Sequence, residues 1–525
     1  MLNFPTLWGG QEGLLHADKI IIIDFGSQYT KLIARKVREC KVYSEIVSCQ
    51  NDLSYLKNDK DIKGIILSGG PSSVYLKNAP ALSEQILGLN VPILGICYGL
   101  HLLSHHFKGN VQTGKVREYG KTNIHKTAKT VLLDNIEGEF SAWMSHGDYI
   151  KALPKDFKIT SRSQNGLISS FEYKKDNIYA VQFHPEVHHT ENGIKILKNF
   201  LFKVCNIRHK WKMGSFIDEK IKEIKEQVGN EKAVLALSGG VDSTVAAFMI
   251  YKAIGKNLKC VHIDNGLMRK NESRDIIKYF SNKLDLKFIN GTDLFLSRLK
   301  GVSDPERKRK IIGKTFIDLF QDYAQKLGKL KYLIQGTLYP DVIESSSFHG
   351  PSVTIKSHHN VGGLPRKLKI KLIEPFRELF KDEVREIGKL LNVPEEIIGR
   401  HPFPGPGLAV RILGDVNKEK LELLREADYI YINSLKEHKL YDRIWQAFTV
   451  LLPVSTVGVM GDSRTYERVI ALRAVNSVDG MTANWFPMPH NVLEEISTKI
   501  TNRVKGINRV VYDISNKPPS TIEWE

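Results

Sequence analysis

Short apolar runs recur along the first part of the chain, and each is followed by a polar or glycine-rich turn. The runs at residues 20–23, 62–67 and 91–96 are apolar at nearly every position, which is typical of strands buried on both faces of a parallel sheet. A helical spacing of apolar residues follows the first run at 32–37. We therefore predict an open, mostly parallel α/β sheet over residues 19–207, with its site at the carboxyl ends of the strands.

The same pattern resumes after a charged helical stretch and then stops at a proline and glycine cluster. Apolar runs at 234–237, 260–264 and 332–335 predict the strands of a second α/β domain. The cluster at 401–407 breaks the pattern. A charged helix near 421–440 and strand-like segments at 456–460 and 509–514 then predict a smaller α+β part.

The predicted boundaries fall after residues 207 and 402. Residues 1–18 fit neither period and are predicted to be an N-terminal extension.

Composition narrows the class of protein. A chain of 525 residues with 42% hydrophobic and 26% charged positions is an ordinary globular protein of about three or four domains. No apolar run approaches the roughly 20 residues of a membrane helix, and the first fifteen residues lack the pattern of a secretory signal. We therefore expect a cytoplasmic protein without a membrane partner.

The charge and the cysteines exclude further classes. The formal net charge of +18 comes from scattered lysines rather than one basic stripe, so we predict no nucleic-acid partner and expect anionic nucleotides instead. The five cysteines contain no CxxC pair, which argues against a disulfide framework or a zinc site. The histidines lack the spacing of a metal motif. Only Cys97 has a context that indicates chemistry.

Cys97 stands where a predicted strand turns sharply into a helix. In Gly95-Ile96-Cys97-Tyr98-Gly99 the glycines permit the strained turn that lifts a nucleophile above a sheet. A thiol needs a base to become a good nucleophile, and His184 follows the apolar strand 179–183. Glu186, two residues on, is spaced to face the same side and orient the imidazole. The pattern predicts a catalytic Cys-His-Glu triad.

An oxyanion hole is predicted beside the cysteine. The backbone N–H groups of Gly70, in the Gly69-Gly70 turn, and of Tyr98, directly after the nucleophile, are the expected donors.

A second motif predicts a phosphate site. Ser238-Gly239-Gly240-Val241-Asp242-Ser243-Thr244 follows the strand 234–237 and opens a helix. Successive N–H groups and hydroxyls at a helix amino end bind anions, and pyrophosphate is the natural occupant. The motif is not a Walker A loop, because the glycine-lysine pair is absent.

Both motifs resemble known families. The motifs at 24–28, 67–72, 95–99, 143–148 and 182–186 are similar, in order, to those of class I glutamine amidotransferases. In that family Cys97 would attack the glutamine carboxamide, form a thioester and release ammonia. The loop at 238–244 resembles the signature of PP-loop ATP pyrophosphatases, which cleave ATP to AMP and pyrophosphate; Asp242 would then help to hold Mg²⁺.

The remaining motifs resemble the GMP synthetase family over about residues 19–525. They lie at 308–313, 316–317, 334–337, 340–345, 400–407, 456–464 and 508–525. The resemblance implies a glutaminase domain at 19–207, an ATP pyrophosphatase domain at 208–402, and a dimerisation and XMP-binding domain at 403–525. It implies XMP, ATP and glutamine as substrates, Mg²⁺ with ATP, no prosthetic group, and a homodimer. It also implies that Ser238, Gly239, Gly240, Val241, Asp242, Ser243 and Thr244 bind ATP, and that Arg269, Asp462, Lys517 and Glu523 contact XMP.

One position departs from the amidotransferase pattern, and two other readings stay open. Where the family usually has a glutamine that helps to hold the substrate, this chain has His101, which cannot offer the amide's donors and acceptor together. A PP-loop amidotransferase that makes NAD or modifies tRNA would share the two main motifs but not the ending KPPSTIEWE at 517–525. A nucleotide sensor without catalysis would need a broken site.

Overall fold

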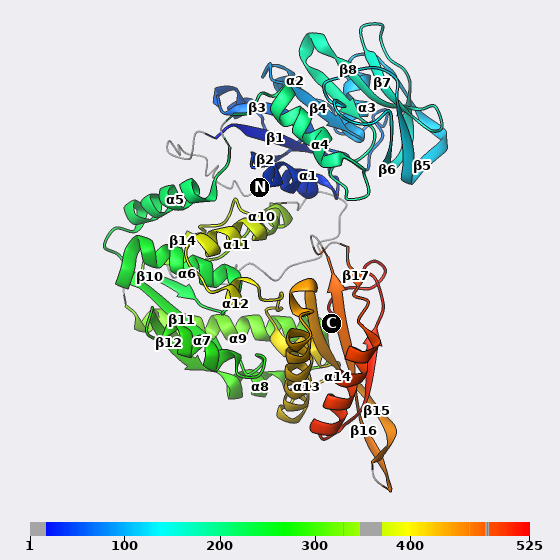
Figure 1. Cartoon of the computed structure of the whole chain (residues 1–525). Helices are drawn as coiled ribbons and strands as arrows, with labels where there is room; N and C mark the ends of the chain where they lie inside the picture. The colour runs from blue at the N-terminus through cyan, green and yellow to red at the C-terminus, as the bar shows by residue number, and fades with distance from the viewer. Residues whose placement is uncertain are drawn as a thin grey trace. The chain divides into compact units, whose positions relative to one another are not determined.

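The structure is a computed structural model that describes residues 17–208, 210–328, 330–346, 370–460, 462–477, 480 and 482–525, and every structural statement below concerns these residues. Its contacts divide the chain into two compact units, one ending at Phe216 and one beginning at Ile217 (Figure 1). Most of the predicted extension at 1–18 lies outside the described residues.

Unit 1 is built on a nine-stranded sheet with the order β2-β1-β3-β4-β9-β8-β7-β5-β6. The first five strands in this order are parallel. They are β1 (Lys19–Asp24), β2 (Tyr43–Ser48), β3 (Ile62–Leu67), β4 (Ile93–Ile96) and β9 (Ile178–Val181). Apart from β2, an edge strand of mixed sequence, their apolar side chains are almost entirely buried, which explains why the sequence shows continuous apolar runs instead of alternation.

The other half of this sheet is antiparallel. It contains β5 (Asn110–Lys126), β6 (Glu139–Ala152), β7 (Lys158–Ser163) and β8 (Ile168–Tyr173). The helices of the unit are α1 (Thr30–Glu39), α2 (Glu84–Leu87), α3 (Tyr98–His106) and α4 (Gly193–Lys198), and α5 (Met213–Val228) spans the division between the units.

Unit 2 begins with a five-stranded parallel sheet in the order β12-β11-β10-β13-β14. Its strands are β10 (Ala233–Ala236), β11 (Leu258–Asp264), β12 (Asp285–Asn290), β13 (Tyr332–Ile334) and β14 (Lys371–Ile373). The accompanying helices are α6 (Val241–Ile254), α7 (Glu272–Phe280), α8 (Thr292–Leu299), α9 (Pro305–Lys326), α10 (Tyr339–Ser346), α11 (Lys381–Leu390) and α12 (Glu395–Ile398).

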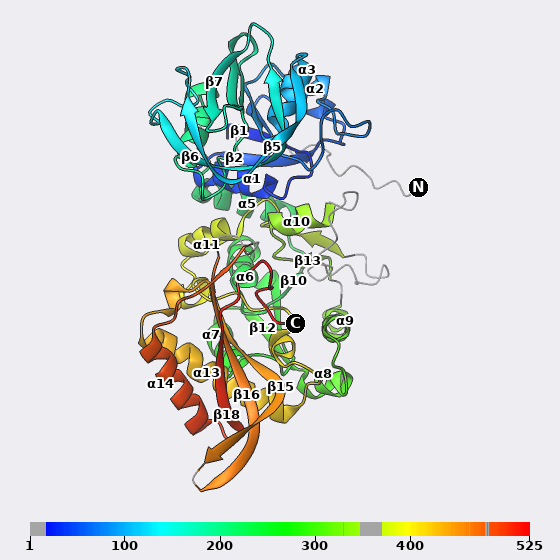
Figure 2. The ribbon, with the colours of Figure 1, turned by 90° about the vertical axis from the view of Figure 1, so that its right-hand side faces the viewer.

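A second sheet follows in the same unit. It combines the long hairpin of β15 (Gln446–Met460) and β16 (Ser463–Asn476) with β17 (Asn484–Trp485) and β18 (Ile507–Asp513). Helices α13 (Lys418–Glu437) and α14 (His490–Arg503) pack against it. Figures 1 and 2 show strands β15 and β16 extending beyond these two helices.

One apolar core joins the two sheets of unit 2. A single cluster of buried side chains includes Val234 and Val261 from the first sheet, and Ile470 and Ile507 from the second. The α/β fold class is confirmed. The domain boundary after residue 402 stays a prediction, and so does the boundary after residue 207.

Candidate functional site

Cys97 lies at the sharp turn between β4 and α3. Its backbone has φ 53° and ψ −103°, a region that residues with a Cβ rarely adopt. The turn is closed tightly, because a Cβ on Gly99 would come within 2.5 Å of the Leu67 carbonyl oxygen. The N–H of Cys97 donates to the carbonyl of Val181 at 2.8 Å, which ties the turn to β9. Such strain at a buried thiol is the arrangement expected of a nucleophile.

His184 and Glu186 follow β9 and lie beside Cys97. His184 Nδ1 is 2.7 Å from Glu186 Oε1, and a carboxylate can only accept, so Nδ1 carries the proton. The imidazole is 2% exposed and the carboxylate is fully buried. Burial alone lowers the pKa of His184, but Glu186 and the hydrogen-bonded Cys97 thiol raise that pKa well above its ordinary value. The three predicted residues are therefore brought together.

The predicted oxyanion residues lie at the same place. A Cβ on Gly70 would be 3.2 Å from Tyr98 Cδ1, and a Cβ on Gly69 would be 3.4 Å from His184 Cε1, so the glycine turn reaches both the helix start and the imidazole. Tyr98 is the first residue of α3, so its N–H has no acceptor within the helix. This geometry fits the predicted donors, whose role stays a prediction.

The buried side chain of Gln182 lies against the cysteine and that of His101 lies behind Gln182, and neither was among the predicted site residues. The Gln182 side-chain amide donates to Cys97 Sγ at 3.8 Å, and Gln182 Oε1 lies 2.7 Å from His101 Nε2. Gln182 precedes His184 by two positions, so strand periodicity was a usable signal for it. The contact with His101 comes from a different element, α3, and has no local signal.

The loop Ser238–Thr244 joins β10 to α6 in unit 2, as predicted for a phosphate site. Gly239 has φ 79°, and Gly240 precedes the first turn of the helix. Ser238 Oγ is 2.9 Å from Ser243 Oγ and accepts from the N–H of Gly240 at 3.3 Å. Arg400 donates to the Gly239 carbonyl at 2.9 Å. The loop is thus held open at a helix amino end, where an anion is favoured.

The loop also offers hard oxygen ligands. Asp242 Oδ1 and Thr244 Oγ1 are buried, and neither has a hydrogen-bond partner in the part of the chain that the structure describes. Asp242 Oδ2 is 3.5 Å from Lys381 Nζ. A buried carboxylate oxygen without a partner fits the coordination that Mg²⁺ prefers, although no group of three or more His, Cys, Asp or Glu side chains forms a metal cage among the described residues.

Two of the four predicted XMP residues, Arg269 and Glu523, lie near the ring of Phe403. Arg269 faces the ring itself, and Glu523 is connected to it through its partner Arg411. The guanidinium of Arg269 lies 5.3 Å from the ring centroid, and that of Arg411 lies 5.1 Å from it. The fully buried Arg411 forms a bidentate pair with Glu523 at 2.8 and 3.1 Å. Arg269 pairs with the buried Asp428 at 3.0 Å. Arg269 and Glu523 therefore belong to one charged cluster next to the start of β15.

The other two predicted XMP residues lie elsewhere in unit 2. Lys517 donates to the Gly480 carbonyl at 2.8 Å. Asp462 is exposed at the turn between β15 and β16. Arg269 contacts the Ala447 carbonyl near the other end of β15, so about 40 Å of extended strand separates Asp462 from that cluster. Within one chain the structure does not bring these four residues together.

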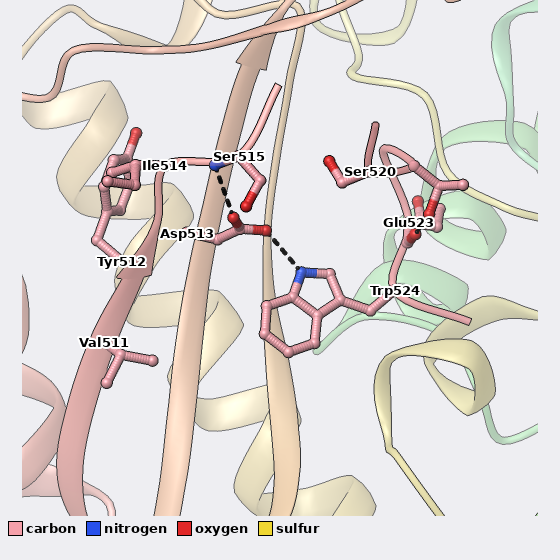
Figure 3. A pocket seen from close by; sticks show the side chains of 9 residues that line it. Val511, Tyr512, Asp513, Ile514, Ser515, Ser520, Glu523 and Trp524 are labelled. Atoms are coloured by element: carbon pink, nitrogen blue, oxygen red, sulfur yellow. Dashed lines mark hydrogen bonds between the residues drawn. The ribbon is translucent and has the colours of Figure 1, made fainter. Parts of the chain in front are cut away.

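A pocket of about 520 Å³ opens beside Glu523 (Figure 3). In it the Trp524 indole N–H donates to Asp513 Oδ2 at 3.0 Å, and Asp513 also pairs with the buried Arg473 at 3.2 Å. Its lining consists of Val511, Tyr512, Asp513, Ile514, Ser515, Ser520, Thr521, Glu523 and Trp524. The pocket therefore places the aromatic rings of Tyr512 and Trp524 and the carboxylate of Asp513 beside Glu523, one of the predicted XMP residues.

No helix among the described residues is long and apolar enough to cross a membrane.

Comparisons with known proteins match three parts of the chain. The family model for glutamine amidotransferase class-I matches residues 21–204, and that for the GMP synthase C terminal domain matches 433–524. The model described as thiamine biosynthesis protein (ThiI) matches 228–299, which includes the loop at 238–244.

Full-length relatives are also similar. A glutamine-hydrolysing GMP synthase of Brachyspira hyodysenteriae is 54% identical over 510 residues, 97% of this chain and 99% of the relative. Those of Aquifex aeolicus and Petrotoga mobilis are 54% and 52% identical, over 96% and 97% of this chain and 99% and 100% of the relatives.

Proposed function

The chain belongs to the family of glutamine-hydrolysing GMP synthases, and from that premise we propose that it makes GMP by coupling two reactions at two separate sites. Glutamine hydrolysis at Cys97 supplies ammonia, and XMP activated by ATP in unit 2 consumes it. The observation that carries the proposal is the buried Cys97, His184 and Glu186 arrangement on the same chain as the open loop at 238–244.

In the first reaction His184 takes the thiol proton and the sulfur attacks the glutamine carboxamide carbon. The N–H groups of Gly70 and Tyr98 stabilise the resulting oxyanion. His184 then returns its proton to the leaving nitrogen, so ammonia departs and a thioester remains on Cys97. Water, deprotonated by the same imidazole, hydrolyses the thioester to glutamate. Glu186 keeps Nδ1 protonated and leaves Nε2 for this proton traffic.

In the second reaction the loop Ser238, Gly239, Gly240, Val241, Asp242, Ser243 and Thr244 holds the phosphates of ATP at the amino end of α6. The xanthine 2-oxygen attacks the α-phosphorus and pyrophosphate leaves; ammonia then attacks C2 and AMP leaves. Mg²⁺, held by Asp242, would neutralise phosphate charge when bound. Arg269, Asp462, Lys517 and Glu523 are proposed as XMP contacts.

A homodimer built on the β15–β16 hairpin is part of the proposal. Val457, Val459 and Tyr466 are 51, 75 and 69% exposed, and Val457 pairs directly with Tyr466 across the hairpin. Large apolar side chains gathered on one projecting ribbon favour burial against a second copy. Light scattering after size exclusion should give twice the mass of one chain for the wild type. The double variant V457E/V459E should give the mass of a single chain.

The decisive experiment measures GMP formed from XMP, ATP and Mg²⁺ with either glutamine or ammonium. Cys97→Ser should lower the glutamine-dependent rate at least about 1,000-fold and leave the ammonium-dependent rate within twofold. Retained glutamine-dependent synthesis in C97S would remove the thioester from the proposal. Failure of the wild type with both nitrogen sources would favour the amidotransferases that make NAD or modify tRNA, or a sensor. Cytoplasmic residence stays a prediction.

A further inference from the structure

A line of three buried polar groups ends at the nucleophile. His101 Nε2 lies 2.7 Å from Gln182 Oε1, and Gln182 Nε2 lies 3.8 Å from Cys97 Sγ, within reach for a sulfur acceptor. The three residues are 4, 1 and 6% exposed. His101 comes from α3 and Gln182 follows β9, so the line connects the two elements that frame the cysteine.

The polarity of this line is fixed by its ends. A thiolate only accepts, so the amide must present its NH₂ group to sulfur and its oxygen to the imidazole. His101 must therefore be protonated at Nε2. Burial, together with the nearby His146, lowers the pKa of His101 to about 4. The ring centroids of the two histidines lie 6.5 Å apart. The His101 ring is therefore neutral, and its single N–H donates to Gln182.

We propose that His101 is a positioning residue for glutamine hydrolysis, which locks the Gln182 carboxamide so that its N–H group faces the Cys97 sulfur. Without the imidazole donor the carboxamide can rotate and turn its oxygen toward sulfur, which repels a thiolate. The donor on sulfur stabilises the negative charge carried by the attacking sulfur and fixes the direction of attack. The inference rests on the proposed nucleophilic role of Cys97.

The structure separates this role from that of a substrate ligand. His101 Nε2 is engaged with Gln182, so this nitrogen is not available to hold the glutamine substrate. A positioning role acts on the reactivity of sulfur and therefore on kcat. A substrate ligand acts chiefly on KM.

Three variants test the proposal in the full-length protein. His101→Phe keeps a planar ring without a donor, His101→Gln keeps a donor, and Gln182→Met removes the amide while His101 stays. Glutaminase kcat and KM are measured in the presence of XMP and ATP, and the alkylation rate of Cys97 by iodoacetamide at one pH is followed by mass spectrometry of the Cys97 peptide.

Loss of one such hydrogen bond should lower kcat and the alkylation rate about tenfold in H101F and Q182M, with KM within twofold, and H101Q should stay within twofold of the wild type. Unchanged alkylation in H101F, a rise in KM alone, or equal loss in H101Q and H101F would overturn the proposal. If H101F lowers the thermal unfolding midpoint strongly, Q182M decides.

The same assays keep the two failures apart. If C97S retains glutamine-dependent synthesis, the proposed function fails. If C97S is inactive and Q182M is fully active, only the positioning role fails.

Discussion

The two sites of this protein are prepared for their reactions to different degrees. In unit 1 His184 and Glu186 are already paired, almost completely buried, and in contact with the cysteine. In unit 2 the loop at 238–244 has two buried oxygens, on Asp242 and Thr244, that have no hydrogen-bond partner among the described residues. A nucleophile must be preorganised by the protein, because the substrate brings no catalytic group. A nucleotide site can leave polar atoms unpaired, because phosphate and metal satisfy them on binding.

Among the variants that compare the two sites, the one expected to impair GMP synthesis most broadly lies in unit 2. Asp242→Asn keeps the shape of the loop and removes the charge proposed to hold Mg²⁺, so GMP synthesis with ammonium and with glutamine should both fall at least about 100-fold. The thermal shift produced by ATP with Mg²⁺ should disappear as well. The rate at which iodoacetamide alkylates Cys97 serves as the control and should not change. Normal ammonium-dependent synthesis in D242N would show that the unpaired oxygen has another purpose.

Glu186→Gln makes the corresponding change in unit 1. The amide lacks the charge that raises the pKa of His184, so that pKa should fall, and the imidazole loses its fixed tautomer. Glutamine-dependent synthesis should drop about 100-fold while ammonium-dependent synthesis stays within twofold. The contrast with D242N, which is expected to lose both, makes the difference between the sites measurable. Equal loss of both activities in E186Q would contradict it.

The sequence predicted the parts of both sites that lie in one continuous motif. Cys97 and the loop at 238–244 each lie between a strand and a helix, where the spacing of the glycines predicts a tight turn. His184 and Glu186 could be predicted to face the same side because side chains alternate with a period of two along an extended chain. These features depend on local backbone geometry, which a short stretch of sequence determines.

Contacts between distant elements were not predictable in this way. The link from His101 to Gln182 joins α3 to the end of β9 and leaves no pattern in either segment. The antiparallel strands β5 to β8 also escaped prediction. The longest of them, β5, is polar and lacks an apolar run, and β8 is buried but contains polar residues. The separation of Asp462 from Arg269 depends on the length of β15, which a motif does not reveal.

A buried ion pair in unit 2 offers a stability comparison. Lys308 Nζ is fully buried, 2.5 Å from Glu525 Oε2, and burial lowers its pKa while Glu525 raises it. Glu525→Gln removes the charge partner and leaves a buried ammonium, which should cost about 3 kcal/mol of unfolding free energy in unit 2. Calorimetry should show one transition moving to lower temperature. K308M/E525Q should recover part of the loss, and a further decrease in that double variant would contradict the desolvation argument.

The smallest expected effect is a pH dependence shared by both units. His101 in unit 1 and His401 in unit 2 both have a pKa of about 4, because burial disfavours the charged ring. Since an unfolded histidine has a pKa near 6.5, the unfolded state binds more protons between about pH 4 and 6.5. The stabilisation by the neutral rings is therefore fully present above about pH 6.5 and is lost as the pH falls toward 4.

At pH 5 each ring should lower the free energy of unfolding of its unit by about 2 kcal/mol relative to its value above pH 6.5. Calorimetry at pH 7 and pH 5 should show both transitions moving to lower temperature in the wild type. His101→Gln should flatten the pH dependence of the unit 1 transition alone, and His401→Gln that of unit 2 alone, because neither glutamine titrates. If both variants keep the wild-type pH dependence, neutral burial of these histidines is not what makes the two units sensitive to acid.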